Sequence, residues 1–326
     1  MASTLNISGS TTGNYTQLPN SLLSVYADEV LHAAQPILRF EAVAVKKQDL
    51  MVTPGQTIKF LKYASLLGTS ALAETASLET TTLTNSEVSI AVQEHAQALQ
   101  FSELLLRTSF HNVMGEATLA LGRNYALNRE RLIKNALLGS ANVKYSQAGG
   151  AATSRANLLS NSTLDLDLIQ DSTEFLATKK APKFGGDGYI CYVHPHQGTA
   201  LRRTNGWLNV ANYADPSRMI NGEIGRIDDV RFVETTMIPK IPVSTQDIYE
   251  DNADTGVNTA VAANTNTDVY RAIMVGEYAV GIADAMDVEL RDDGVQNFGR
   301  YRSLAWYNIM GAGLIESDHV VVLETA

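Results

Sequence analysis

The chain has 326 residues, of which 45% are hydrophobic and 18% charged. This composition is typical of a globular protein, and it excludes a disordered polyampholyte or a coiled coil. The formal net charge of −10 argues against tight binding of nucleic acid by the bulk of the chain, because proteins that grip phosphates usually carry a basic balance. The single cysteine, Cys191, excludes an internal disulfide framework and a cysteine-rich zinc site.

The beginning of the chain lacks the features of a secretory signal. The first Lys or Arg is Arg39, and no apolar run in the chain approaches the roughly 20 residues that span a bilayer. We therefore expect a soluble protein made in the cytosol, without membrane contact. Residues 1–18 are rich in Ser, Thr, Asn and Gly and predict a polar arm. A helix is predicted to follow, from Pro19-Asn20 to Pro36.

Two strands with alternating apolar residues are predicted at 57–61 and 87–93. The stretch between them, residues 67–86, is rich in Thr, Ser, Ala and Leu, so we expect a long hairpin with a flexible tip. An isolated two-stranded hairpin is only marginally stable in water, and its apolar faces therefore require a partner.

Helical periodicity is strongest over residues 110–138, and Gly139 follows where a helix end is expected. A Gly/Ala/Ser-rich linker is predicted at 139–157. A second helix is predicted to begin at the cap Thr163 and to end at Lys179-Lys180, a charge order that suits the helix dipole.

The second half of the chain predicts a mixture of strands and short helices. A buried strand at 189–193 is followed by a short helix from His194-Pro195 to about Arg202. Residues 250–268 contain neither Lys nor Arg and predict a long exposed loop. Further strands are predicted near 227–234, 269–275, 278–283, 301–313 and 319–323. The elements show no regular βα alternation, so the expected fold class is α+β.

Cys191, His194 and His196 lie close together in the string CYVHPH. One interpretation is a metal site, and another is a cysteine nucleophile with a histidine base, which would make the protein a hydrolase. A zinc site needs three or four ligands, however, and a cysteine on a buried strand is usually inert. We therefore favour a core cysteine followed by a helix that Pro195 begins.

No other motif assembles a catalytic or cofactor site. The acidic stretch 251–268 places Ala253 and Ala262 where a calcium-binding EF-hand loop requires oxygen ligands. The glycines at 185, 186 and 188 do not follow a strand, so they match neither a P-loop nor a dinucleotide fingerprint. We expect no catalytic residue, no cofactor and no metal, and the protein is not expected to be an enzyme.

The order of the parts resembles the major capsid protein of tailed bacteriophages, with its Hong-Kong-97-type fold. That order is polar arm, short helix, long hairpin, long single helix, mixed domain and terminal strands. The run Asn221 to Thr235, NGEIGRIDDVRFVET, is the most specific stretch and resembles the coat proteins of N-four-type podoviruses. Two further stretches support the resemblance, namely residues 54–60 and the string VHPH at 193–196 with Leu201-Arg202.

The resemblance implies a division of the chain. Its parts would be an N-terminal arm with a short helix, an extended loop hairpin, a peripheral domain with a spine helix, an axial domain, and terminal strands that return to the peripheral domain. These would occupy residues 1–40, 41–100, 101–164, 165–300 and 301–326, respectively. The extended loop would lie across an adjacent subunit, and the residues expected to make that contact are Ile58, Phe60, Leu72, Leu78, Leu83, Val88 and Ile90.

The implied function is structural. The chain would assemble with itself into hexamers and pentamers of an icosahedral capsid shell in the virion, after synthesis in the host bacterial cytoplasm. Its other expected partners are a separate scaffolding protein, a portal, a decoration protein, and packaged double-stranded DNA contacted weakly and without sequence specificity. The alternative is an encapsulin-type compartment shell, which shares the fold but encloses cargo enzymes. Genome neighbours would discriminate the two: portal and terminase genes, or a cargo enzyme.

Overall fold

The computed structural model describes residues 39–48, 55–63, 66, 80, 82–109, 113–148, 150, 152–186, 188–203, 208–209, 223–238, 240–243, 248–250, 259–261, 264 and 266–326. The helix predicted between Pro19 and Pro36 lies outside these residues. The chain divides into two compact units. The first contains Glu94–Ala126 and Asp287–Asn308, and the second contains the described residues of Leu38–Gln93, Leu127–Met286 and Ile309–Ala326.

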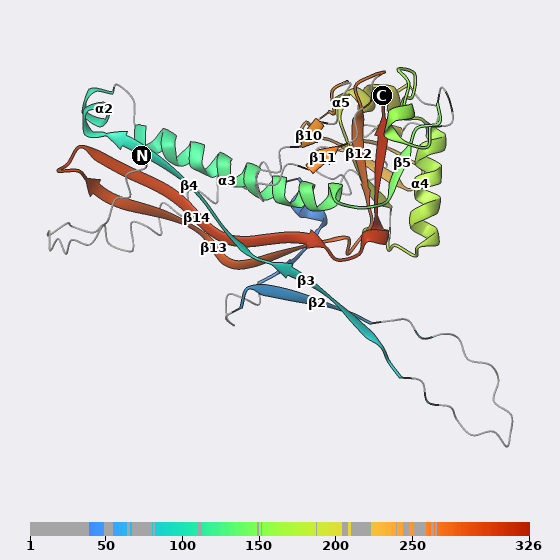
Figure 1. Cartoon of the computed structure of the whole chain (residues 1–326), viewed down its shortest axis with the longest axis horizontal. Coiled ribbons are helices and arrows are strands. Elements are labelled where there is room, and N and C mark those ends of the chain that lie inside the picture. The colour runs from blue at the N-terminus through green and yellow to red at the C-terminus, as the bar shows by residue number, and fades with distance from the viewer. Residues whose placement is uncertain are drawn as a thin grey trace. The chain divides into compact units, whose positions relative to one another are not determined.

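A seven-stranded sheet forms the centre of the second unit (Figure 1). The pairs β6–β9 and β15–β5 are parallel and the other neighbours are antiparallel. The strands, in their order across the sheet, are β5 (Val143–Tyr145), β15 (Val320–Thr325), β12 (Tyr270–Val275), β6 (Tyr189–Val193), β9 (Val230–Glu234), β8 (Glu223–Ile227) and β7 (Leu208–Asn209).

Both faces of this sheet are buried. Cys191 and Met274 pack with residues of the helices α4 (Leu166–Thr178) and α5 (Pro195–Leu201) on one face. Ile190 and Ile273 pack on the other face, against the 3-10 helix η2 (Phe40–Val43) and the last turns of α3 (Val113–Leu138). Burial on both sides explains why the central strands read as continuous apolar runs and not as alternating patterns.

The first unit combines the beginning of α3 with long strands and a short helix. These are β4 (Gln93–Ser102), α2 (Glu103–Thr108), β13 (Val280–Gln296) and β14 (Tyr301–Leu314). The last two strands continue into the second unit, and a four-stranded sheet has the order β1-β13-β14-β4, with β1 at Ala44–Lys47. The core of the first unit contains Trp306, whose indole N–H donates to Asn124 over 2.9 Å and whose ring meets Tyr125 edge-on at 5.5 Å.

Several predicted elements are confirmed, with corrected ends. The 110–138 helix is α3, and the strand at 189–193 is β6 with all five residues buried. The cap of α4 is Asp165, whose carboxylate accepts from the Leu168 N–H over 3.1 Å, and not Thr163. The strand predicted near 227–234 is a hairpin of β8 and β9, whose turn holds Asp228 at φ 48°. Neither β4 nor α2 was predicted, because their short apolar patterns follow the strand β3 (Asn85–Ala91) without a turn signal.

The 250–268 segment differs from the predicted exposed loop in its described residues. A short antiparallel pair joins β10 (Ile248–Glu250) to β11 (Thr259–Val261). Asn264 is fully buried, and its amide donates to the carbonyl oxygens of Arg155 and Leu158 over 2.7 and 3.0 Å. Its side-chain amide therefore bonds a carbonyl oxygen in the 3-10 helix η4 (Arg155–Asn157) and another just after the end of that helix. A third 3-10 helix, η7, spans Ser317–His319.

Candidate functional site

The strongest candidate site is the hairpin of β2 (Thr57–Tyr63) and β3 (Asn85–Ala91), which confirms the two predicted strands. The pairing is antiparallel, with Ile58 opposite Ile90 and Phe60 opposite Val88. Because successive side chains of a strand point to opposite faces, these four apolar residues share one face and their neighbours share the other. The hairpin therefore has an apolar inner face and a separate outer face.

The inner face packs against the chain itself. Ile58, Phe60 and Ile90 keep 3%, 6% and 4% of their surface exposed. They form a cluster with Ala283 of β13, and Val45 of β1 and Ile315 pack against it. The expectation that these residues need a neighbouring subunit to cover them is therefore not met at the base of the hairpin, because β1 and the ends of β13 and β14 already cover it.

Two glycines permit this close packing. A Cβ atom at position 281 would lie 2.7 Å from Phe60 Cζ, and one at position 311 would lie 2.1 Å from the carbonyl oxygen of Ala91. Real Cβ atoms do not approach other atoms so closely, so a side chain at position 311 would clash with backbone and one at position 281 would force the Phe60 ring to shift. The base of the hairpin is thus fixed against β13 and β14.

Basic side chains hold the same base by polar contacts. Lys47 donates to the carbonyl oxygen of Lys59 over 3.0 Å, and its ammonium lies 4.9 Å from the centre of the Phe60 ring. Lys62 pairs with Glu316, and Lys59 pairs with Glu87 across the hairpin at 2.6 Å. These contacts are partly exposed, so each adds little stability by itself.

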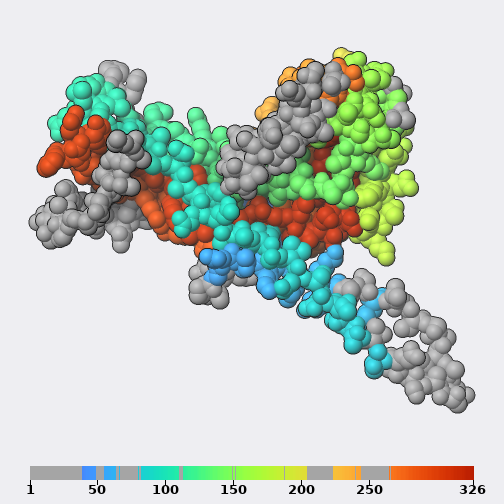
Figure 2. Space-filling view, viewed as in Figure 1, coloured from blue at the N-terminus to red at the C-terminus, as the bar shows by residue number. Residues whose placement is uncertain are grey.

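The outer side of the hairpin and the residues towards its tip expose apolar surface. Leu61, Tyr63, Leu66 and Leu83 are 58%, 60%, 65% and 59% exposed. Figure 2 shows the blue and cyan atoms of the hairpin at the surface of the second unit. Apolar side chains exposed to this extent are available for contact with another molecule.

The seven predicted contact residues therefore fall into three groups. Ile58, Phe60, Ile90 and the half-buried Val88 face the chain's own core, and Leu83 is exposed. Leu72 and Leu78 lie outside the described residues. The prediction omitted Leu61 and Tyr63, although the period-two pattern places both opposite the apolar face that it identified.

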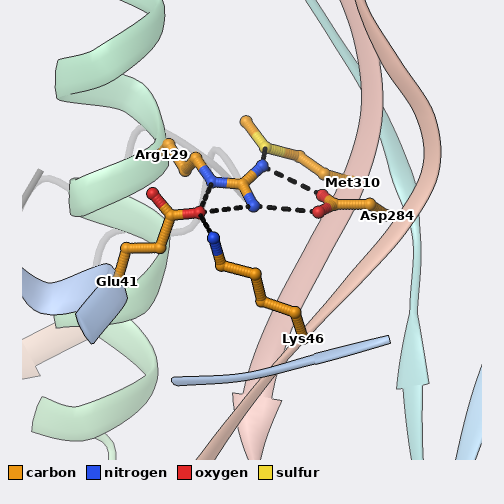
Figure 3. A network of polar contacts seen from close by, with 5 residues as sticks. All are labelled: Glu41, Lys46, Arg129, Asp284 and Met310. Atoms are coloured by element: carbon orange, nitrogen blue, oxygen red, sulfur yellow. Dashed lines mark hydrogen bonds and ion pairs between the residues drawn. The ribbon is translucent and has the colours of Figure 1, made fainter. Parts of the chain in front are cut away.

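A second notable site is the segment at residues 39–47, which leads from the N-terminal region into β1; we call it the arm root. Arg129 of α3 makes two hydrogen bonds to the carboxylate of Asp284, at 3.0 and 2.8 Å (Figure 3). It also pairs with Glu41 at 3.0 Å, and Glu41 in turn pairs with Lys46 at 2.5 Å. The side chains of Arg129, Asp284 and Glu41 are only 8%, 4% and 12% exposed.

The start of the arm root makes further buried polar contacts. The backbone N–H of Arg39 donates to the carboxylate of Glu130, and the hydroxyl of Tyr192 donates to the carbonyl oxygen of Arg39 over 2.9 Å. Burial raises the pKa of Glu130 above its ordinary value, although the Arg39 N–H and charge oppose the rise. The arm root is therefore attached to α3 and the central sheet by several directional contacts.

The Cys191 region carries no catalytic arrangement among the described residues. Cys191 is fully buried in the core, and burial raises the pKa of its thiol far above the ordinary value. The ring of His194 instead caps α5, its Nδ1 accepting from the His196 N–H over 3.2 Å, while His196 stacks on Tyr270 at 4.2 Å. The described residues hold no cluster of three or more His, Cys, Asp or Glu side chains suited to a metal ion.

None of the described helices is long and apolar enough to cross a membrane.

One family model matches most of the chain. Residues 85–323 match the model of a family described as phage capsid protein. No curated protein matches the sequence.

Solved capsid structures share the fold. The capsid of Ralstonia phage GP4 superposes with a TM-score of 0.70 at 16% identity, covering 87% of each chain. The capsid of cyanophage P-SCSP1u gives 0.62 at 16% identity over 88% of each chain. That of cyanophage Pam1 gives 0.61 at 14%, covering 90% of this chain and 92% of the other. The predicted α+β class and Hong-Kong-97-type fold are thereby confirmed.

Proposed function

Because this chain belongs to the phage capsid protein family and is a structural subunit of the virion shell, not an enzyme, we propose that its copies assemble into hexamers and pentamers. These would close an icosahedral shell around double-stranded DNA. The observation that carries the proposal is the two-faced hairpin, whose base is fixed to its own chain while its outer surface and tip expose leucine and tyrosine.

The proposal assigns the two parts of the hairpin different roles. The inner face, at Ile58, Phe60 and Ile90, holds the hairpin to its own subunit. Leu61 and Tyr63 on the outer face, with Leu66, Leu83 and the predicted tip residues Leu72 and Leu78, contact the adjacent subunit. Burying such side chains against a neighbour stabilises the contact by about 25 cal/mol for each Å² of apolar area removed from water.

The remaining expected partners follow the same proposal. A net charge of −10 suits a shell that contacts packaged DNA weakly, since DNA phosphates repel an acidic surface. A separate scaffolding protein, a portal and a decoration protein are proposed as further partners. The predicted arm, extended loop, peripheral domain, axial domain and terminal strands are proposed as the domains that make these contacts.

Shortening the hairpin tests the proposal. Residues 70–84 are replaced by a Gly-Ser turn, which keeps the packed base. We expect the free subunit to retain its circular dichroism and cooperative melt, while electron microscopy finds no closed shells. Assembly of the shortened chain at the wild-type yield would contradict the proposed contact, and loss of the subunit's cooperative melt would place the tip in the core of a single chain.

A pair of matched variants separates the two faces. Leu61→Ser combined with Tyr63→Ser should leave the melting temperature of the free subunit unchanged and lower the yield of shells. Ile58→Ala should instead lower the free energy of unfolding by about 2–5 kcal/mol, because it leaves a cavity in the inner cluster. Equal effects of both variants on subunit stability would contradict the division of roles.

Within the family, we propose a relationship to the coat proteins of N-four-type podoviruses. The support is the sequence run 221–235, part of which forms the hairpin of β8 and β9. Electron microscopy of the virion provides the test, because podoviruses carry a short tail. A long tail on particles made of this chain would contradict the assignment.

A further inference from the structure

The buried carboxylate of Glu130 caps the beginning of the arm root. The 3-10 helix η2 begins there, and its cap residue, Arg39, makes no capping hydrogen bond with its own side chain. The first N–H groups of a helix have no partner within the helix. Glu130, a residue of α3 that is only 2% exposed, accepts the hydrogen bond of the Arg39 N–H. A carboxylate from a distant part of the chain therefore supplies the cap that η2 itself lacks.

The basic side chains around Glu130 bond to other groups. The Arg39 guanidinium donates to a backbone carbonyl oxygen of β9. Arg129, the preceding residue of α3, binds Asp284 of β13 and Glu41 of the arm root (Figure 3). The Glu130 carboxylate is therefore held by backbone N–H, while the nearby cations compensate other groups.

The groups that face Glu130 from the other elements act on its charge in both directions. From the arm root, Glu41 repels a second negative charge, whereas the charge of Arg39 and the N–H groups of Arg39 and Phe40 favour one. From β6, the Tyr192 hydroxyl donates to the Arg39 carbonyl oxygen over 2.9 Å and not to the carboxylate. Burial has the largest effect, and it raises the pKa of Glu130 above its ordinary value.

The raised pKa sets the direction in which pH acts on this segment. When residues 39–43 leave α3, water reaches Glu130 and its pKa returns towards the ordinary value. The closed segment therefore binds the proton more tightly than the open one. Closure is most favourable below the ordinary pKa, and this advantage is lost as the pH rises through the raised pKa.

The rest of the arm root has attachments that do not involve Glu130. The strand β1 pairs in parallel with β13 over its whole length. Residues 39–43 depend instead on the Glu130 contact, the ion pair to Arg129 and the burial of Phe40. They can therefore open while β1 stays paired with β13.

We propose that Glu130 is a pH-sensitive switch for the start of the arm root. While Glu130 is neutral, residues 39–43 stay closed on α3. Ionisation of Glu130 makes them open locally more often, without unfolding of the central sheet. Opening moves the point at which the 38 preceding residues join the folded subunit. The inference concerns a single subunit and does not rest on the proposed assembly.

Hydrogen–deuterium exchange of the free subunit, measured by mass spectrometry, tests the switch. The protection of residues 39–43 is corrected for the intrinsic pH dependence of amide exchange. It should fall about threefold or more between about pH 5 and about pH 8. The same residues should be less protected than the buried strand β6 at every pH, because they open without unfolding of the sheet.

Two variants assign the pH dependence to one group. Glu130→Gln removes the titrating carboxyl and keeps a hydrogen-bond acceptor, so the protection of residues 39–43 should no longer fall over this pH range. Glu116→Gln is the matched control, because Glu116 is an exposed carboxyl of the same helix. This control should keep the fall in protection that the wild type shows.

Three results would overturn the inference. They are a pH-independent protection of residues 39–43 in the wild type, an equal fall in Glu130→Gln, and a protection of these residues equal to that of β6. The first and the third are measured on the wild type, so they decide the question even where a variant does not fold. All three would leave the proposed function intact, because it rests on the assembly of the wild-type chain.

Discussion

Replacing Arg129 by methionine should destabilise the subunit strongly, because it removes the centre of the buried ion network at the arm root. Its guanidinium donates two hydrogen bonds to Asp284, whose side chain is only 4% exposed. Removing one partner of a buried ion pair typically costs 3–5 kcal/mol, since the other charge is left without compensation. We therefore expect Arg129→Met to lower the free energy of unfolding by about 3–5 kcal/mol.

Urea denaturation of the free subunit, followed by circular dichroism, measures this loss. Two further variants serve as controls for the loss in Arg129→Met. Lys46→Ala removes a cation that is 53% exposed and should cost less than about 1 kcal/mol. Arg129→Met combined with Asp284→Leu should recover most of the loss, because the Asp284 carboxylate is gone and Glu41 keeps its partner Lys46. A loss below about 1 kcal/mol for Arg129→Met, or no recovery in the double variant, would refute the reasoning.

Three further predictions concern single groups. Burial raises the pKa of Glu130, so ionisation of this carboxyl destabilises the folded state. The free energy of unfolding, measured in urea, should therefore be higher for Glu130→Gln than for the wild type. This difference should grow from about pH 4 to about pH 7 and be absent in acid. The Cys191 thiol should react with a thiol reagent in urea but not in the native protein. In a urea titration, Cys191→Ser should lower the free energy of unfolding by about 1–2 kcal/mol, because the hydroxyl of the new serine is buried. By thermal melting, Asp165→Ala should cost about 1 kcal/mol and Thr163→Ala less than half of that, since Asp165 caps α4.

Each of these predictions has a clear contrary result. If the free energies of unfolding of Glu130→Gln and the wild type differed by the same amount at every pH, the Glu130 carboxyl would have the same pKa in the folded and unfolded chain. Rapid labelling of Cys191 in the native protein would contradict its burial. A larger loss of stability for Thr163→Ala than for Asp165→Ala would show that Thr163, the cap predicted from the sequence, caps α4.

The long elements of this fold could be predicted from sequence because their periodicity is strong. Residues 110–138 repeat apolar side chains at helical spacing, and β2 and β3 alternate with period two. The cap of α4 was misplaced because Thr163 and Asp165 are both good capping residues, and only the backbone geometry selects Asp165.

The candidate site was harder to predict for two physical reasons. Alternation shows that Ile58 and Phe60 share a face, but not whether that face meets the same chain or another one. The approach of β13 decides this, and Gly281 makes it possible at a position more than 200 residues away in sequence. The ion network likewise joins Glu41, Arg129 and Asp284, whose separation in the sequence hides their contact.

The two-faced hairpin also limits how this chain can change in length. Deleting one residue within β2 would shift its register and exchange the faces, so that Lys59 and Leu61 would enter the inner cluster and Phe60 would leave it. Insertions or deletions inside the strands should therefore be tolerated only in pairs of residues, whereas the segment 64–84 between the strands is free of this constraint. Related chains are expected to differ in length between the strands. Within each strand, the number of residues should stay the same or change by two.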